Sequence, residues 1–215
     1  MLENSELRAL ARSQLKGNWA KPILAFLIYS AITAIFAWIS NDENAAASLI
    51  SLLITGPFMV GASVFSLAFS RQEDPGVGVI FDGFKSFLTS LGMYLWVLLW
   101  VILWSLLLII PGIVKSYGYL MSFYILADNR QIGIRNALDL SKRISYGYRG
   151  KLFLLYLSFI GWAVLSILTA GIGFIWLIPY VEITIANFYN DLKRTSIENG
   201  ICVPEDFNRD NYRAV

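Results

Sequence analysis

The sequence predicts an all-α membrane protein with six transmembrane helices, arranged as three hairpins. Composition gives the first two observations: 57% of the 215 residues are hydrophobic and 15% are charged, whereas about a quarter of a typical soluble domain is charged. The third is that the apolar residues, with a mean hydropathy of +0.60 for the chain, fall in long blocks separated by short charged segments. A helix that crosses a bilayer needs roughly 20 apolar residues, and these blocks are long enough.

Four apolar blocks supply the six helices: residues 22–39, 45–69, 87–127 and 152–189. The first two are each long enough for one crossing. The third has 41 residues, which fits two crossings with a turn near residues 104–106. The fourth also fits two crossings, and the glycine-containing run at residues 169–173 predicts the turn between them.

Basic residues are concentrated on one side of this predicted membrane domain. Sixteen of the 17 lysines and arginines lie in four segments expected on that side: residues 1–21, 70–86, 128–151 and 192–215. The other side has the acidic loop 41–44 and two nearly uncharged turns. Because lysine and arginine are enriched in cytoplasmic loops, both termini are expected in the cytoplasm.

We expect a single polytopic membrane domain over residues 1–215. Its parts are an amphipathic N-terminal segment (1–21), a helical bundle (22–191) and a polar cytoplasmic tail (192–215). The N-terminal segment has no apolar stretch with a cleavage site, so we expect the first helix to be retained. The one cysteine, Cys202, is expected to be a surface thiol in the tail.

A threefold internal repeat is indicated by what precedes each hairpin. Apolar residues at helical spacing predict three short cytoplasmic amphipathic helices: Leu7, Leu10, Ala11 and Leu15; Val77, Ile80, Phe81 and Phe84; Ile134, Ala137, Leu138 and Ser141. The second helix of each hairpin contains a candidate helix-breaking proline, Pro57, Pro111 or Pro179. The alternative is that prolines are simply more frequent in membrane helices.

Several short motifs occur together in this chain: Ile110-Pro111-Gly112-Ile113, Ala127-Asp128-Asn129, Ser158-Phe159-Ile160-Gly161-Trp162, Thr169-Ala170-Gly171-Ile172-Gly173, Pro179-Tyr180 and Phe188-Tyr189. Their combination resembles an uncharacterised family of bacterial membrane proteins, catalogued as domain of unknown function 975 and found mostly in Gram-positive bacteria. The likeness extends from the first amphipathic segment to about Asp191. The family has no established activity, so the resemblance implies a topology and a bacterial plasma membrane but no reaction.

Much chemistry is excluded by residue type. Without histidine and with one cysteine, the chain has no zinc site built on those residues and no Ser-His-Asp or Cys-His nucleophile. It also has no glycine-rich phosphate loop. Asp128 and Asp139 fall in a cytoplasmic loop, where a capping or solvated role is usual. We therefore expect no enzyme, no metal and no cofactor.

Lys115 and Glu182 are the candidate site residues, because each carries a charge within a predicted membrane helix. They follow Pro111 by four residues and Pro179 by three. Charged residues at such depth usually face the bundle interior, form pairs or line a pathway. Three interpretations stay open: each side chain extends to the membrane interface, the two form a structural pair, or they take part in transport or ligand binding.

Three classes of function remain. The first is a non-enzymatic scaffold or accessory protein that binds lipid or a partner through a basic cytoplasmic face. The second is a small transporter, or a peptide-export or immunity component, that uses the proline-containing helices. The third and least favoured is a lipid-modifying enzyme. We expect membrane lipids, and another membrane protein or a peptide, as partners, and no nucleic acid.

Overall fold

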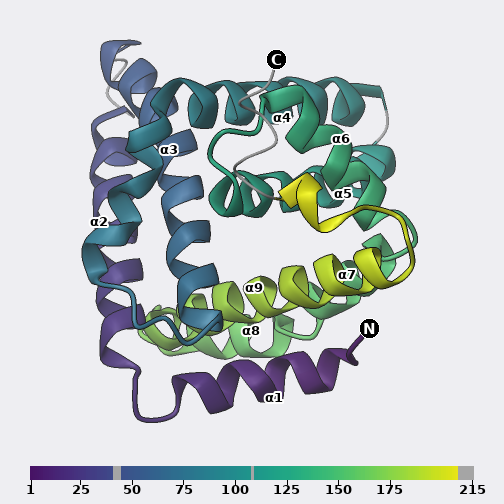
Figure 1. Cartoon of the computed structure of the whole chain (residues 1–215). Helices are drawn as coiled ribbons and strands as arrows, with labels where there is room; N and C mark the ends of the chain where they lie inside the picture. The colour runs from purple at the N-terminus through teal and green to yellow at the C-terminus, as the bar shows by residue number, and fades with distance from the viewer. Residues whose placement is uncertain (41–44, 108, 208–215) are drawn as a thin grey trace.

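A computed structural model describes residues 1–40, 45–107 and 109–207, and their side chains except those of residues 40, 45–48, 104–107 and 109–115. This part of the chain is helical, without strands (Figure 1). The elements in order are α1 (Asn4–Leu15), α2 (Ala20–Ser40), α3 (Ala45–Ser70), the 3-10 helix η1 (Val77–Ser86), α4 (Phe87–Leu107), α5 (Ile109–Asp128), α6 (Ile134–Ser145), α7 (Arg149–Leu157), α8 (Ile160–Leu168), α9 (Phe174–Glu198) and the 3-10 helix η2 (Pro204–Phe207). The all-helical class is confirmed.

Four helical stretches in the described residues are long and apolar enough to cross a membrane. They are Ala20–Ile39, Leu49–Ser70, Val77–Leu103 and Arg149–Leu168. Their outer faces carry many exposed large apolar side chains, among them Trp38, Leu49, Leu88 and Leu168. Such faces need lipid or protein to cover them, so several apolar helices consistent with a membrane protein are present.

The three predicted amphipathic segments are helical and pack inward by most of their predicted apolar residues, but Leu10 and Phe81 are exposed. In α1, Leu7, Ala11 and Leu15 are fully buried, and a capping box of Glu3 and Glu6 begins the helix. In α6, the buried face includes Ala137 and Leu138. The middle segment, η1, is a 3-10 helix instead of an α-helix, and it buries Ile80.

The long helices and the amphipathic helices pack in a recurring order. Helix η1 packs on α3, α6 packs on α5, and α1 packs on α9, beside which it runs in Figure 1. The α3–η1 contact needs two glycines: a Cβ on Gly61 would lie 1.8 Å from the Ile80 carbonyl oxygen, and one on Gly83 would lie 1.8 Å from that of Pro57. Only glycine permits backbones to approach this closely.

Residues 104–106, where a turn was predicted, belong to helix α4. Helix α4 continues to Leu107 and α5 begins at Ile109, and residue 108 between them lies outside the described residues. The turn predicted at residues 169–173 is confirmed, because α8 ends at Leu168 and α9 begins at Phe174. Ala170 and Gly171 have positive φ values of 53° and 86° there.

The last apolar block forms three helices where two were predicted. The additional break comes at Ser158 and Phe159, between α7 and α8, where the Ser158 hydroxyl donates to the Leu155 carbonyl at 2.6 Å. Each of these two helices has nine residues, which gives a length of about 13 Å. Neither alone is long enough to cross a bilayer core of about 30 Å.

The prolines do not interrupt the helices that contain them. Helices α3 and α9 are continuous through Pro57 and Pro179, and Pro111 is the third residue of α5. In the first turn the missing N–H of proline has no intrahelical partner in any case. Inside a helix the loss is one hydrogen bond, which packed neighbours tolerate. The three prolines thus lie within α-helices, and their role as helix-break sites stays a prediction.

The beginnings of α2 and α9 lie close together. A cavity of about 150 Å³ is lined by Ile23 and Phe26 of α2 and by Phe174 and Ile175 of α9. A second cavity joins α1 to the turn before α9, as described below. In a six-crossing bundle the beginnings of α2 and α9 would lie on opposite sides, whereas here they lie together. Helix α9 buries the polar residues at its centre against several other helices. A helix that faces lipid would be apolar at these positions.

Candidate functional site

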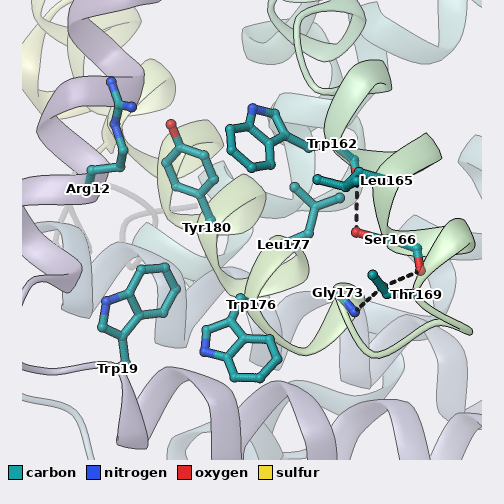
Figure 2. Close-up of a pocket in the computed structure, with 10 residues that line it drawn as sticks. All are labelled: Arg12, Trp19, Trp162, Leu165, Ser166, Thr169, Gly173, Trp176, Leu177 and Tyr180. Carbon is teal, nitrogen blue, oxygen red and sulfur yellow. Dashed lines mark hydrogen bonds between the residues drawn. The ribbon is translucent and has the colours of Figure 1, made fainter.

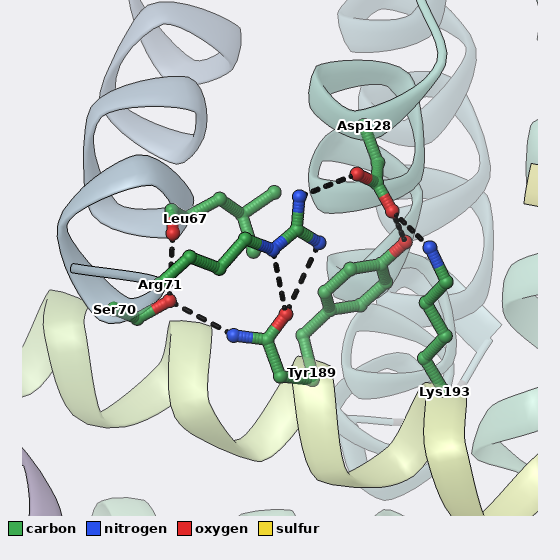
Figure 3. A network of polar contacts seen from close by, with 7 residues as sticks. Leu67, Ser70, Arg71, Asp128, Tyr189 and Lys193 are labelled. Carbon is green, nitrogen blue, oxygen red and sulfur yellow. Dashed lines mark hydrogen bonds and ion pairs between the residues drawn. The ribbon is translucent and has the colours of Figure 1, made fainter. Parts of the chain in front are cut away.

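The ends of α3 and α5 meet α9 at a cluster of charged side chains centred on Asp128 (Figure 3). Arg71, the residue after α3, donates from Nη1 to one Asp128 carboxylate oxygen at 2.7 Å. Lys193 of α9 donates to the other oxygen at 2.6 Å. The Tyr189 hydroxyl donates to that same oxygen at 3.2 Å. One carboxylate thus binds two cations and a phenol from two other helices.

Amide and hydroxyl groups extend this cluster to a second contact between α3 and α9. The Arg71 guanidinium donates to the Asn190 Oδ1 through Nε at 3.2 Å and through Nη2 at 3.1 Å. The Asn190 amide nitrogen in turn donates to the Ser70 hydroxyl at 2.9 Å. We call Ser70, Arg71, Asp128, Tyr189, Asn190 and Lys193 the Asp128 network. It joins three helices that belong to three different hairpins of the sequence.

Asp128 is ionised within this network. Its side chain is 9% exposed, and those of Arg71 and Lys193 are 32% and 25% exposed. Burial by itself raises the pKa of Asp128, but hydrogen bonds and positive charge from Arg71 and Lys193 outweigh it and hold this pKa below its ordinary value. The same pairing raises the pKa of Arg71 against the effect of its own burial. These three side chains together carry a net charge of +1.

Glu182 lies next to a small cavity among the helices. The Tyr124 hydroxyl of α5 donates to the Glu182 carboxylate at 3.2 Å. The cavity has a volume of about 100 Å³ and is lined by side chains of α2, α3, α5, α7 and α9, including Tyr29, Tyr124 and Tyr156. The Glu182 carboxylate and the tyrosine hydroxyls around it can bind a water molecule or a small cation, and the carboxylate can accept a proton.

The side chain of Lys115 lies outside the described part of the structure, so its pairing with Glu182 stays a prediction. The partner that the structure assigns to Glu182 is Tyr124. Of the candidate prolines, Pro57 lies in α3 and Pro179 in α9, and both helices line the Glu182 cavity. Within the described residues, no group of three or more cysteine, aspartate and glutamate side chains is placed to hold a metal.

Comparison with known families identifies the chain's relatives. The sequence profile of a family described as protein of unknown function (DUF975) matches residues 1–116 and 106–196. The chain belongs to the DUF975 family. This match confirms the family resemblance that was inferred from the short sequence motifs. No curated protein and no solved structure matches the chain.

Sequence reasoning missed the central residue of the Asp128 network in this DUF975 protein. Asp128 was expected to be capping or solvated, whereas it is nearly buried and binds residues 57 and 65 positions away. A usable signal was present, because Arg71 and Asp128 are each the first charged residue after a long apolar block. The expectation of a surface thiol is also wrong, since Cys202 is only 5% exposed and burial raises its pKa.

Proposed function

We propose that this DUF975 protein is a multi-pass protein of the bacterial plasma membrane that acts as a non-enzymatic scaffold or accessory protein. Its working surface is a basic cytoplasmic face that binds a partner or anionic lipid. The observation that carries the proposal is the arrangement of α1 and α6: each buries its apolar residues against the long helices and leaves basic residues exposed, namely Arg12, Lys16, Arg135 and Arg143.

The charge of this face supports the proposal. Positive side chains close to an anionic membrane surface contribute about 1 kcal/mol each. Asp128 holds the ends of α3 and α5 against α9, so these basic side chains are presented on a fixed arrangement of helices. A fixed arrangement is what a binding surface requires, because little conformational entropy is lost when the partner binds.

The topology that goes with this function has both termini in the cytoplasm. We infer that the α2–α3 and α4–α5 hairpins cross the membrane, and that α7, α8 and α9 stay beside α1 at the cytoplasmic face. The closeness of the beginnings of α2 and α9 supports this arrangement. We also infer a threefold repeat of one amphipathic helix and one hairpin, since η1, α6 and α1 each pack on the last helix of the preceding unit in cyclic order.

Proximity labelling in cells tests the scaffold function. A labelling enzyme fused after the C-terminus should mark a defined set of neighbours around the wild-type protein. Replacing Arg12, Lys16 and Arg135 by glutamine removes three of the four exposed charges named above and should remove neighbours from that set. Glu182→Gln, a change inside the molecule, is the control and should leave the set unchanged. The same set for the wild type and the triple variant would contradict the proposal.

A small transporter is the second candidate, and the Glu182 cavity is the observation that favours it. The three helices that contain the candidate prolines, α3, α5 and α9, all line this cavity. A buried carboxylate is also a frequent element of proton pathways. Proteoliposomes with an internal pH-sensitive dye and an imposed proton gradient provide the test. Transport requires proton entry that Glu182→Gln abolishes, whereas equal leakage with both proteins excludes a proton-coupled mechanism through Glu182.

A further inference from the structure

We propose that a cavity between α5, α6 and α7 binds a phosphate group, as part of an anionic phospholipid headgroup or of a soluble phosphate ester. The cavity has a volume of about 430 Å³ and is lined by three basic residues, Lys142, Arg143 and Arg149, with Tyr119 and Tyr146 beside them. This volume is in the range of small-molecule sites, roughly 300–1,000 Å³. Lysine, arginine and tyrosine are all hydrogen-bond donors to phosphate oxygens.

Arg149 is held in place at the base of this cavity. Its guanidinium lies over Gly118 of α5, where a Cβ would come within 3.1 Å of the guanidinium carbon. Its Nε donates to the Ser145 hydroxyl at 3.4 Å. The Ser141 hydroxyl donates to the Gly118 carbonyl at 2.8 Å and so fixes α6 on α5 at the same level. The glycine therefore makes room for the guanidinium, and the serines keep the two helices in register around it.

The positive charge in the cavity is not balanced by the protein groups around it. Lys142 pairs with Asp139 at 3.3 Å, and both side chains are about half exposed at 43% and 58%, so this pair is weak. Within the described residues, neither Arg143 nor Arg149 has a carboxylate within 4.0 Å. Two arginines that face one cavity without an acid repel each other, and a bound phosphate removes that repulsion. The planar guanidinium suits two-point binding of phosphate.

A purely structural role explains only part of this arrangement. Lys142 and Arg143 lie in the last turn of α6, where positive charge interacts favourably with the helix dipole. Arg149, however, is the first residue of α7, where the same dipole disfavours a cation and favours an anion. An anion bound between the end of α6 and the beginning of α7 accounts for all three basic residues at once.

Native mass spectrometry of the full-length protein in detergent tests the site, with phosphatidylglycerol and inorganic phosphate as the two probes. Replacing Lys142, Arg143 and Arg149 by glutamine should weaken phosphatidylglycerol binding at least about tenfold. The matched control is a variant with Lys21, Lys85 and Lys151 replaced by glutamine, which loses the same charge outside the cavity and outside the basic face of α1 and α6 and should bind normally. Arg143→Gln alone, an exposed change that leaves the packing intact, should weaken binding several-fold.

The two probes separate the two sources of phosphate. If inorganic phosphate displaces the lipid from the wild type, a soluble phosphate ester satisfies the site; if it does not, the site takes the lipid headgroup. Equal weakening in both triple variants, or none in the cavity variants, overturns the proposal. The inference rests on the proposed function only for the cytoplasmic position of α6. The proposed function and this phosphate site can fail independently, because the proximity-labelling test changes basic residues outside this cavity.

Discussion

Arg71, one residue past the end of α3, forms an ion pair with Asp128, the last residue of α5, at a distance of 2.7 Å. The two residues are 57 positions apart and come from different hairpins. Lys193 reaches the same carboxylate from α9. Asp128 is therefore the carboxylate that joins these three chain segments in the Asp128 network.

Asp128→Asn should destabilise the folded protein by about 1–3 kcal/mol. Removing one partner of a fully buried pair costs about 3–5 kcal/mol, and the partial exposure of Arg71 and Lys193 reduces that figure. Asp74→Asn is the matched control, because Asp74 pairs with Lys21 at the surface and such pairs contribute about 0–1 kcal/mol. Thermal unfolding in detergent measures both. Equal melting temperatures for the two variants would show that the network adds no stability.

The same carboxylate gives the stability a defined pH dependence. Because the folded-state pKa of Asp128 lies below its ordinary value, the unfolded state binds the proton more readily. The stabilisation is therefore present above the unfolded pKa of about 4 and is lost as the pH falls through the lower folded pKa. The difference in melting temperature between the wild type and Asp128→Asn should shrink as the pH falls from 7 to below 4. A difference that stays constant over this range would contradict the assignment.

Gly61→Ala should prevent normal folding or greatly lower stability. Its Cβ would lie 1.8 Å from the Ile80 carbonyl oxygen, and this backbone contact has no flexible side chain to move aside. Overpacking costs typically 1–3 kcal/mol, and we expect the upper end of that range or more. Gly78→Ala, in η1 with no atom within 4 Å of its Cβ, should fold normally. Size-exclusion profiles of the two variants provide the comparison, and a normal profile for Gly61→Ala would refute this α3–η1 contact.

The sequence predicted local features better than it predicted the relations between distant segments. The apolar period of Leu7, Leu10, Ala11 and Leu15 identified a helix correctly, and all of these residues except Leu10 are buried. By contrast, Asp128 looked like an ordinary helix end, because its partners are set by how α3 and α9 approach α5. The break at Ser158 was also missed, since the residues on both sides of it are uniformly apolar and have no periodicity that changes there.

The pairing of Lys115 with Glu182 remains a prediction that a double-mutant cycle tests. If the two side chains interact, removing one leaves the other charge uncompensated, so each single change should cost more than the double change. Lys115→Met, Glu182→Gln and the double variant are compared by thermal unfolding. Additive effects would mean that Glu182 relies on Tyr124, its hydrogen-bond partner in the structure, and not on the lysine.

The cavity shared by α1 and the turn before α9 bears most directly on the topology (Figure 2). It has a volume of about 350 Å³ and is lined by Arg12 and Trp19 on one side and by Thr169, Gly173 and Trp176 on the other. Arg12 is exposed and charged, and such a side chain favours a polar boundary of a membrane. The topology proposed above therefore puts the turn at residues 169–173 on the same side as α1.

Cysteine accessibility in intact cells measures this relation. In a Cys202→Ser background, Ser13→Cys marks α1 and Ile172→Cys marks the turn, where the isoleucine is 58% exposed. Our account predicts that neither cysteine reacts with a membrane-impermeant maleimide in intact cells and that both react after permeabilisation. Reaction of Ile172→Cys in intact cells, with Ser13→Cys still protected, would place the turn outside the cell and contradict the account.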